Sequence, residues 1–182
     1  DNVLNRYPDP RQTKVLQKLS ALKNIPLENM MLGNGSDELI DLLIRLFCEP
    51  GKDTLLYCPP TFGMYQVSAD INNVETVQIP LDENYDLDIK EILKNIDGVK
   101  MMFLCSPNNP TANLMSVERI EKILKKFSGI VVVDEAYIEF TDQPSFINQL
   151  DEFPNLIVLQ TFSKYWGLTG ARLGMVYANK TV

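Results

Sequence analysis

The fold is decided by one stretch of the sequence, KMMFLCSPNNPTANLMSVERIEKILKKFSGIVVVDEAY, which runs from Lys100 to Tyr137. It opens with an apolar run, Lys100–Cys105, and closes on a second one, Ile130–Asp134, and both are typical of buried parallel strands. Between them, after Ser116, apolar residues recur at helical spacing: Val117, Ile120, Ile123, Leu124 and Phe127. Strand, helix and strand in this order predict part of an α/β sheet that helices cover on both faces.

The same alternation continues in both directions along the chain. Further apolar runs predict strands at Met30–Gly33, Thr54–Cys58, Val74–Ile79, Leu156–Gln160 and Leu173–Ala178. A second helical pattern follows Asp86, which we take as its cap. The segment DELIDLLIRLF is apolar almost all round, so we expect a deeply buried helix capped by Ser36. The predicted fold class is a three-layer α/β/α arrangement with a mostly parallel, seven-stranded sheet.

Composition and charge narrow the possible functions. The chain has 182 residues, of which 45% are apolar, and a net charge of -7, which argues against nucleic-acid binding. No stretch approaches the roughly 20 apolar residues of a membrane span, and no signal peptide is evident, so we expect a cytoplasmic protein. The cysteines Cys48, Cys58 and Cys105 stand far apart in apolar segments, as small buried hydrophobes do. We therefore expect neither a disulfide framework nor a metal site.

The chain contains no histidine. This excludes Ser-His-Asp and Cys-His catalysis and most transition-metal sites. If the protein is an enzyme, its proton carrier at neutral pH must be a lysine, a perturbed carboxylate, a tyrosine, a cysteine or a cofactor.

Chemically distinctive motifs follow five of the predicted strands. They are GNGSDE, CPPTFGMY, SPNNPT, DEAY and TFSK, in chain order. In open α/β sheets, ligands bind outside the carboxyl ends of the strands, so these motifs should meet at one edge. Each motif alone also has an ordinary explanation, such as a tight turn, a core aromatic ring or a solvated lysine.

One ligand would account for all of these motifs together. Gly33, Gly35 and Ser36 lead into a helix, whose N-terminus binds phosphate well, and Arg172 could add a bidentate contact. Phe62, or Tyr65, could stack on a ring, and the turn with Asn108 and Asn109 holds an amide in place. Asp134 needs a cationic partner at its buried strand end, and the amine of Lys164 can form a Schiff base. These are the requirements of a phosphorylated pyridine aldehyde, pyridoxal 5'-phosphate (PLP).

The assembled motifs resemble those of fold-type I PLP-dependent aminotransferases, and within them the histidinol-phosphate aminotransferase family. The phrases NRYPDP, LIRLFCEPGKD, CPPTFGMY, GVKMMFLCSPNNPT, DEAYIEF and TFSK stand in the family's order and spacing. One departure is Ala112 after Asn-Pro-Thr, where the family usually has Gly. The resemblance covers essentially the whole chain.

The resemblance implies a role for each site residue. Lys164 would bind PLP covalently and carry the proton, Asp134 would pair with the ring nitrogen, and Tyr137 and Asn109 would bond the phenolic oxygen. Phe62 would stack on the ring. The phosphate would be held by Ser36, Asp37, Thr161, Ser163 and Arg172, with Tyr7 reaching the site of a neighbouring subunit in a homodimer.

The resemblance also implies a reaction and a domain. The reaction would be amino transfer between histidinol phosphate and 2-oxoglutarate, two small molecules, in histidine biosynthesis. Residues 1–182 would be the PLP-binding large domain, without the family's N-terminal arm and small C-terminal domain, so we expect this stretch alone to be inactive. Two alternatives stay open: a related aminotransferase or decarboxylase for another amino acid, and a PLP-binding domain without catalysis.

Overall fold

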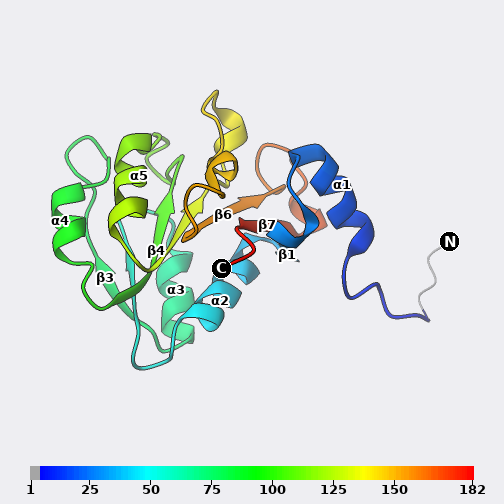
Figure 1. Ribbon diagram of the computed structural model, residues 1–182, viewed down its shortest axis with the longest axis horizontal. Helices are drawn as coiled ribbons and strands as arrows, with labels where there is room; N and C mark the ends of the chain where they lie inside the picture. The colour runs from blue at the N-terminus through cyan, green and yellow to red at the C-terminus, as the bar shows by residue number, and fades with distance from the viewer. Residues whose placement is uncertain (1–4) are drawn as a thin grey trace.

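A computed structural model describes residues 5–182 as a twisted sheet flanked by helices (Figure 1). The strands are β1 (Met30–Asn34), β2 (Thr54–Tyr57), β3 (Glu75–Gln78), β4 (Val99–Cys105), β5 (Ile130–Asp134), β6 (Leu156–Thr161) and β7 (Leu173–Ala178). The helices are α1 (Thr13–Lys23), α2 (Ser36–Phe47), α3 (Met64–Ile71), α4 (Ile89–Lys94) and α5 (Val117–Lys126). Short 3-10 turns are η1 (Leu27–Asn29), η2 (Ile138–Phe140), η3 (Phe146–Gln149) and η4 (Thr169–Ala171). Each predicted strand is confirmed to within one residue at either end.

The strand order places the carboxyl ends of the parallel strands together. The order is β1-β7-β6-β5-β4-β2-β3. Strand β7 runs antiparallel to both of its neighbours, and the other pairings are parallel, so the predicted mostly parallel sheet is confirmed. Strands β4 and β5 pair from Met101 with Ile130 to Cys105 with Asp134. This register brings SPNNPT and DEAY out of the sheet side by side.

Helices cover both faces of the sheet, as the sequence predicts. Helices α2 and α3 lie on one face, and α4 and α5 on the other (Figure 1). Alternate residues of β4 serve the two cores: Met101 and Phe103 pack with α2 and α3, whereas Met102 and Leu104 pack with α4 and α5. Both cores consist mainly of apolar side chains, and the residues that could carry polar chemistry gather at the strand ends.

Three local expectations are corrected by the structure. Helix α2 buries only one face, and Leu46 on the other is 64% exposed, because the helix lies on the surface of the sheet. Gly35, and not Ser36, is the N-cap of α2. Helix α4 is capped by Asp88, which accepts the Glu91 N–H at 3.0 Å.

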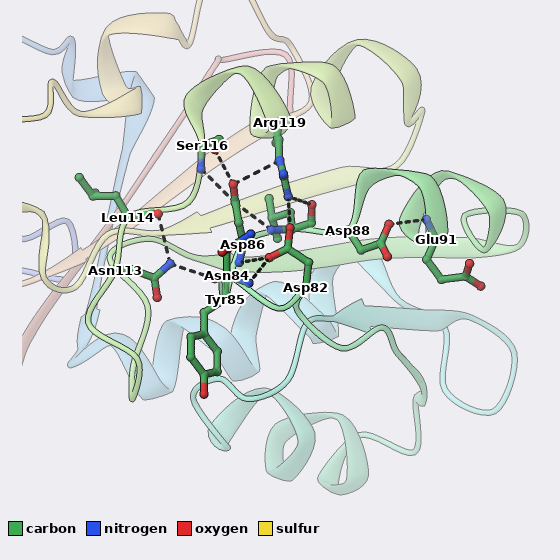
Figure 2. A network of polar contacts seen from close by, with 11 residues as sticks. Asp82, Asn84, Tyr85, Asp86, Asp88, Glu91, Asn113, Leu114, Ser116 and Arg119 are labelled. Carbon is green, nitrogen blue, oxygen red and sulfur yellow. Dashed lines mark hydrogen bonds and ion pairs between the residues drawn. The ribbon is translucent and has the colours of Figure 1, made fainter.

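The carboxylate of Asp86 serves a different helix. It accepts hydrogen bonds from Ser116 at the start of α5 and is therefore not available to cap α4 (Figure 2).

Within residues 5–182, no helix combines the length and the apolar character that a membrane crossing requires.

Candidate active site

A pocket lies at the carboxyl edge of the sheet, where the motifs after the strands meet. Its lining comes from five strand ends and the segment before β7: Ser36, Asp37, Phe62, Cys105, Asn109, Asp134, Ala136, Tyr137, Ser163, Lys164, Thr169 and Arg172. Of the residues to which the resemblance assigns a role, all line this pocket except Thr161 and Tyr7. Cys105, Ala136 and Thr169 also line it, although the sequence gives none of them a role at the site.

Asp134, the last residue of β5, is the buried acid of the pocket. Its side chain is 2% exposed; Oδ2 accepts the Tyr65 hydroxyl at 2.7 Å and Oδ1 accepts the Ala136 N–H at 3.1 Å. Burial raises the pKa of Asp134 to about 6, and these two hydrogen bonds oppose the rise. No ion pair to Asp134 is found among residues 5–182. Because a carboxylate can accept about four hydrogen bonds, Asp134 can still accept one from a cationic N–H in the pocket.

The start of α2 and Arg172 form an anion-binding corner. The first N–H groups of a helix have no acceptor within the helix, and here they border the pocket at Ser36 and Asp37. Arg172 folds over Gly35: its Nη2 donates to the Asn34 carbonyl at 3.1 Å, and its own carbonyl accepts the Gly35 N–H at 2.9 Å. Gly35 has φ +84°, and a Cβ there would overlap the guanidinium. Glycine at position 35 therefore allows the cation to approach the helix start.

Thr161 acts on the same corner indirectly. It is 1% exposed and does not line the pocket; its Oγ1 lies 3.0 Å from Ser163 Oγ and accepts the Ser163 N–H at 3.1 Å. Thr161 thus orients Ser163, whose side chain does line the pocket. A direct phosphate contact from Thr161 stays a prediction.

Lys164 supplies the amine of the pocket. It follows β6, its side chain is exposed at the pocket wall, and its Nζ lies 5.5 Å from the centroid of the Tyr137 ring. Tyr137 and Asn109 line the same wall. A primary amine, a phenol and an amide therefore stand together next to the buried carboxylate.

Asn108 holds the loop that presents Asn109. Its side chain is 2% exposed, accepts the Thr61 hydroxyl at 2.8 Å, and donates to the Pro60 carbonyl at 2.9 Å and to Thr111 Oγ1 at 2.7 Å. The expectation that this turn anchors an amide is met by Asn108, which leaves the neighbouring Asn109 free to face the pocket.

Tyr65 has a different place from the one considered in the sequence. It is fully buried and stacks on Phe103 at 4.8 Å between ring centroids, so it cannot also stack on a ligand ring. Its hydroxyl contacts Asp134 instead. The sequence carries no direct signal for this contact, because it joins the first turn of α3 to the end of β5 across the core. Phe62 lines the pocket, as predicted.

Tyr7 lies apart from these residues. Its side chain is fully exposed, and it does not line the pocket. Its contact with a neighbouring subunit remains a prediction.

Comparison of the sequence with known proteins shows which family the chain belongs to. The family model for aminotransferase class I and II matches residues 1–182. A histidinol-phosphate aminotransferase of Cytophaga hutchinsonii is 55% identical over 181 residues, which cover 99% of this chain and 52% of that protein. The chain therefore spans about half the length of the curated relatives it matches.

Two solved structures share the fold. The histidinol-phosphate aminotransferase of Clostridium acetobutylicum superposes with a TM-score of 0.86 at 30% identity, covering 97% of this chain and 53% of that one. The enzyme of the same name from Sinorhizobium meliloti, solved in complex with pyridoxal-5'-phosphate, gives a TM-score of 0.87 at 25% identity, covering 96% of this chain and 49% of that one.

Proposed function

The chain belongs to the class I and II aminotransferase family, and on this premise we propose that it is the PLP-binding part of a histidinol-phosphate aminotransferase. The reaction would be amino transfer between histidinol phosphate and 2-oxoglutarate in histidine biosynthesis. One observation carries the proposal: a buried carboxylate, Asp134, which forms no ion pair with the described residues 5–182, faces a pocket that also holds the amine of Lys164. A buried carboxylate and a nearby amine suit a ligand that carries both a basic ring nitrogen and an aldehyde group.

The residues at each end of the pocket fit PLP. Ser36, Ser163 and Arg172 offer N–H, O–H and guanidinium donors to the phosphate. Asp134 offers an acceptor to a protonated ring nitrogen, which would offset the cost of burying its charge. The bound cofactor supplies a ring that withdraws electrons from the bond being broken at the substrate α-carbon.

The remaining residues would position the ring and move the proton. Phe62 would cover one face of the ring, and Asn109 and Tyr137 would donate hydrogen bonds to its phenolic oxygen. Lys164 Nζ would hold the cofactor through a covalent bond. Once released from that bond, the same amine would take the proton from the substrate α-carbon and later give it up again as the product forms. This role for an amine is consistent with a chain that has no histidine.

Three further statements belong to the same proposal. Residues 1–182 would be the large domain of a longer enzyme; residues 1–4 of that span lie outside the described structure. The enzyme would work in the cytoplasm as a homodimer in which Tyr7 reaches the phosphate of the neighbouring site. All three rest on the family resemblance and on the length of the relatives.

The cofactor role is tested by chemical trapping. PLP is added to the purified protein, the adduct is reduced with borohydride, and the labelled peptide is mapped by mass spectrometry. We expect one phosphopyridoxyl group, on Lys164, and none after Lys164→Ala. Lys125, an exposed lysine on α5, is the internal control and should stay unlabelled. Label spread over surface lysines, with none on Lys164, would refute the proposal for this chain.

The substrate is tested on the full-length enzyme. Incubation with histidinol phosphate and 2-oxoglutarate should yield glutamate. Release of carbon dioxide from a phosphorylated amino acid, with no glutamate formed, would instead favour the decarboxylase alternative.

A further inference from the structure

We infer that Tyr65 is a positioning residue for Asp134. The hydrogen bond from its hydroxyl group holds the carboxylate in one orientation and favours the charged form. In this state the carboxylate can accept a hydrogen bond from a cationic ring nitrogen in the pocket. This inference deepens the proposed function and rests on it for the identity of the ligand. The contact itself is a property of the folded chain. It can therefore be tested without any ligand.

The contact is short, buried and rigid. Tyr65 Oη donates to Asp134 Oδ2 at 2.7 Å, and both side chains are almost completely buried. The Tyr65 ring lies nearly parallel to Phe103, at 14° and 4.8 Å between centroids, and meets Phe62 edge-on at 84° and 5.7 Å. Because the ring is held between two other rings, the Tyr65 hydroxyl oxygen cannot move away from the carboxylate without disturbing the core.

Among the described residues, Tyr65 is the only side chain that donates a hydrogen bond to Asp134; the other donor is the backbone N–H of Ala136. The charged or titratable groups that face it are Asp37 from α2, Cys105 from β4 and Lys164 after β6, in addition to Tyr65 from α3. Burial is the main effect on the pKa of Asp134 and raises it, and Asp37 adds to the rise. Tyr65 is the strongest of the groups that lower it, ahead of the Ala136 N–H and Lys164.

Tyr65 itself remains protonated at any physiological pH. Burial, and then the nearby charge of Asp134, raise the pKa of Tyr65 well above its usual value. A phenol that keeps its proton is a permanent donor. Because the same ring touches Phe62, one side chain also aligns the stacking surface with the carboxylate.

The test measures the titration of Asp134 directly, in the protein without added ligand. Carboxyl carbons of aspartate are labelled with carbon-13, their NMR shifts are followed from pH 4 to 9, and the Asp134 signal is assigned by its loss in Asp134→Asn. In Tyr65→Phe, which keeps the ring and removes the hydroxyl, the midpoint should rise by about one to two pH units. An unchanged midpoint in a folded Tyr65→Phe protein overturns the inference.

Tyr57→Phe is the matched control. Tyr57 is also buried beside Tyr65, at 6.4 Å between ring centroids, but its hydroxyl donates to Gln66 at 2.7 Å and not to Asp134. Its removal should leave the Asp134 midpoint where it is. An equal shift in both variants would indicate a general effect on packing and would count against a specific role for Tyr65.

A second measurement does not depend on Tyr65→Phe folding. With tyrosine labelled at Cζ in the otherwise unchanged protein, the Tyr65 signal should move as Asp134 titrates near pH 6, and it should stay constant in Asp134→Asn. A Tyr65 signal that ignores this titration overturns the inference.

Ligand affinity then separates the two claims. Tyr65→Phe should weaken PLP binding about two- to tenfold at pH 7, with the difference closing toward pH 9, where the carboxylate is charged in both proteins. If the unchanged protein does not bind PLP at Lys164, the proposed function fails, whereas the NMR titration still decides the role of Tyr65.

Discussion

Ala112 shows how one residue can oppose the local backbone. It adopts φ +61° in the turn after Asn109, a left-handed conformation that costs an L-residue roughly 1–2 kcal/mol. The turn is held all the same, because the Ala112 N–H donates to the Asn108 carbonyl at 2.8 Å and the Asn108 N–H donates to the Asn113 carbonyl at 2.8 Å. Glycine, the usual residue at this position in the family that the sequence resembles, would adopt this conformation without strain.

We therefore predict that Ala112→Gly stabilises the protein. The gain should be about 0.5–1 kcal/mol in the free energy of unfolding, since relief of strain exceeds the added entropy of a glycine in the unfolded chain. Urea denaturation measures it. Ala21→Gly, at an exposed position in the last turn of α1, is the control and should have the opposite sign, a loss of up to about 1 kcal/mol. A loss at both positions would contradict the strain argument.

The position of a site residue could be predicted from the sequence where the residue lies at or just after the end of a predicted strand. Asp134 ends the apolar run of β5, Lys164 lies shortly after that of β6, and parallel strands bring such ends together. Tyr65 could not be predicted in this way, because its contact with Asp134 depends on how α3 packs across the sheet. Thr161 shows the same limit at short range: the residue is at the site, but its hydroxyl faces Ser163.

At the scale of elements, a polar network ties the loop before α4 to helix α5 (Figure 2). Asp86 accepts the Ser116 N–H at 3.1 Å and the Ser116 hydroxyl, and it pairs with Arg119 Nε at 3.2 Å. Arg119 also donates to Asp82 at 2.6 Å and to the Leu87 carbonyl at 2.7 Å. Asp86 thus satisfies the start of α5 from outside the helix, which sequence spacing alone could not reveal.

Asp86→Ala should destabilise the protein by about 2 kcal/mol, because it leaves Ser116 at the start of α5 without its acceptor and removes one of the two carboxylates paired with Arg119. Glu83→Ala, an exposed site in the same loop, should cost less than about 0.5 kcal/mol. Chemical denaturation compares the two variants. Hydrogen exchange at the first turn of α5 should also speed up in Asp86→Ala alone, and equal protection in both variants would show that the network does not hold this helix.

At the scale of the whole molecule, two consecutive buried acids, Asp134 at the end of β5 and Glu135 just after it, have different roles. Asp134 lines the pocket, whereas Glu135 accepts the Phe146 N–H and the Gln160 amide, each at 2.8 Å, and ties the next segment to the sheet. Burial raises the pKa of both carboxyls to about 6. The site is therefore held in a fold that is less stable when these acids are charged.

This arrangement predicts an unusual pH dependence for the protein without bound cofactor. Both acids have a higher pKa in the folded chain than in the unfolded chain, so the folded state binds more protons and stability falls as pH rises through about 6. Lowering the pH from 7 to 5 should therefore raise the free energy of unfolding by roughly 1 kcal/mol for each acid. Below about pH 4 the gain should reverse, because hydrogen bonds and charge from Arg119 hold the pKa of Asp82 below its usual range and that ion pair is then lost.

Urea denaturation at each pH provides the measurement. Asp134→Asn should remove about half of the gain. If the free energy of unfolding of the unaltered protein is the same at pH 7 and pH 5, burial does not raise the pKa of the two acids. Under the proposed function, saturation with PLP should remove the Asp134 share as well, because a cationic ring nitrogen beside the carboxylate would favour its charged form.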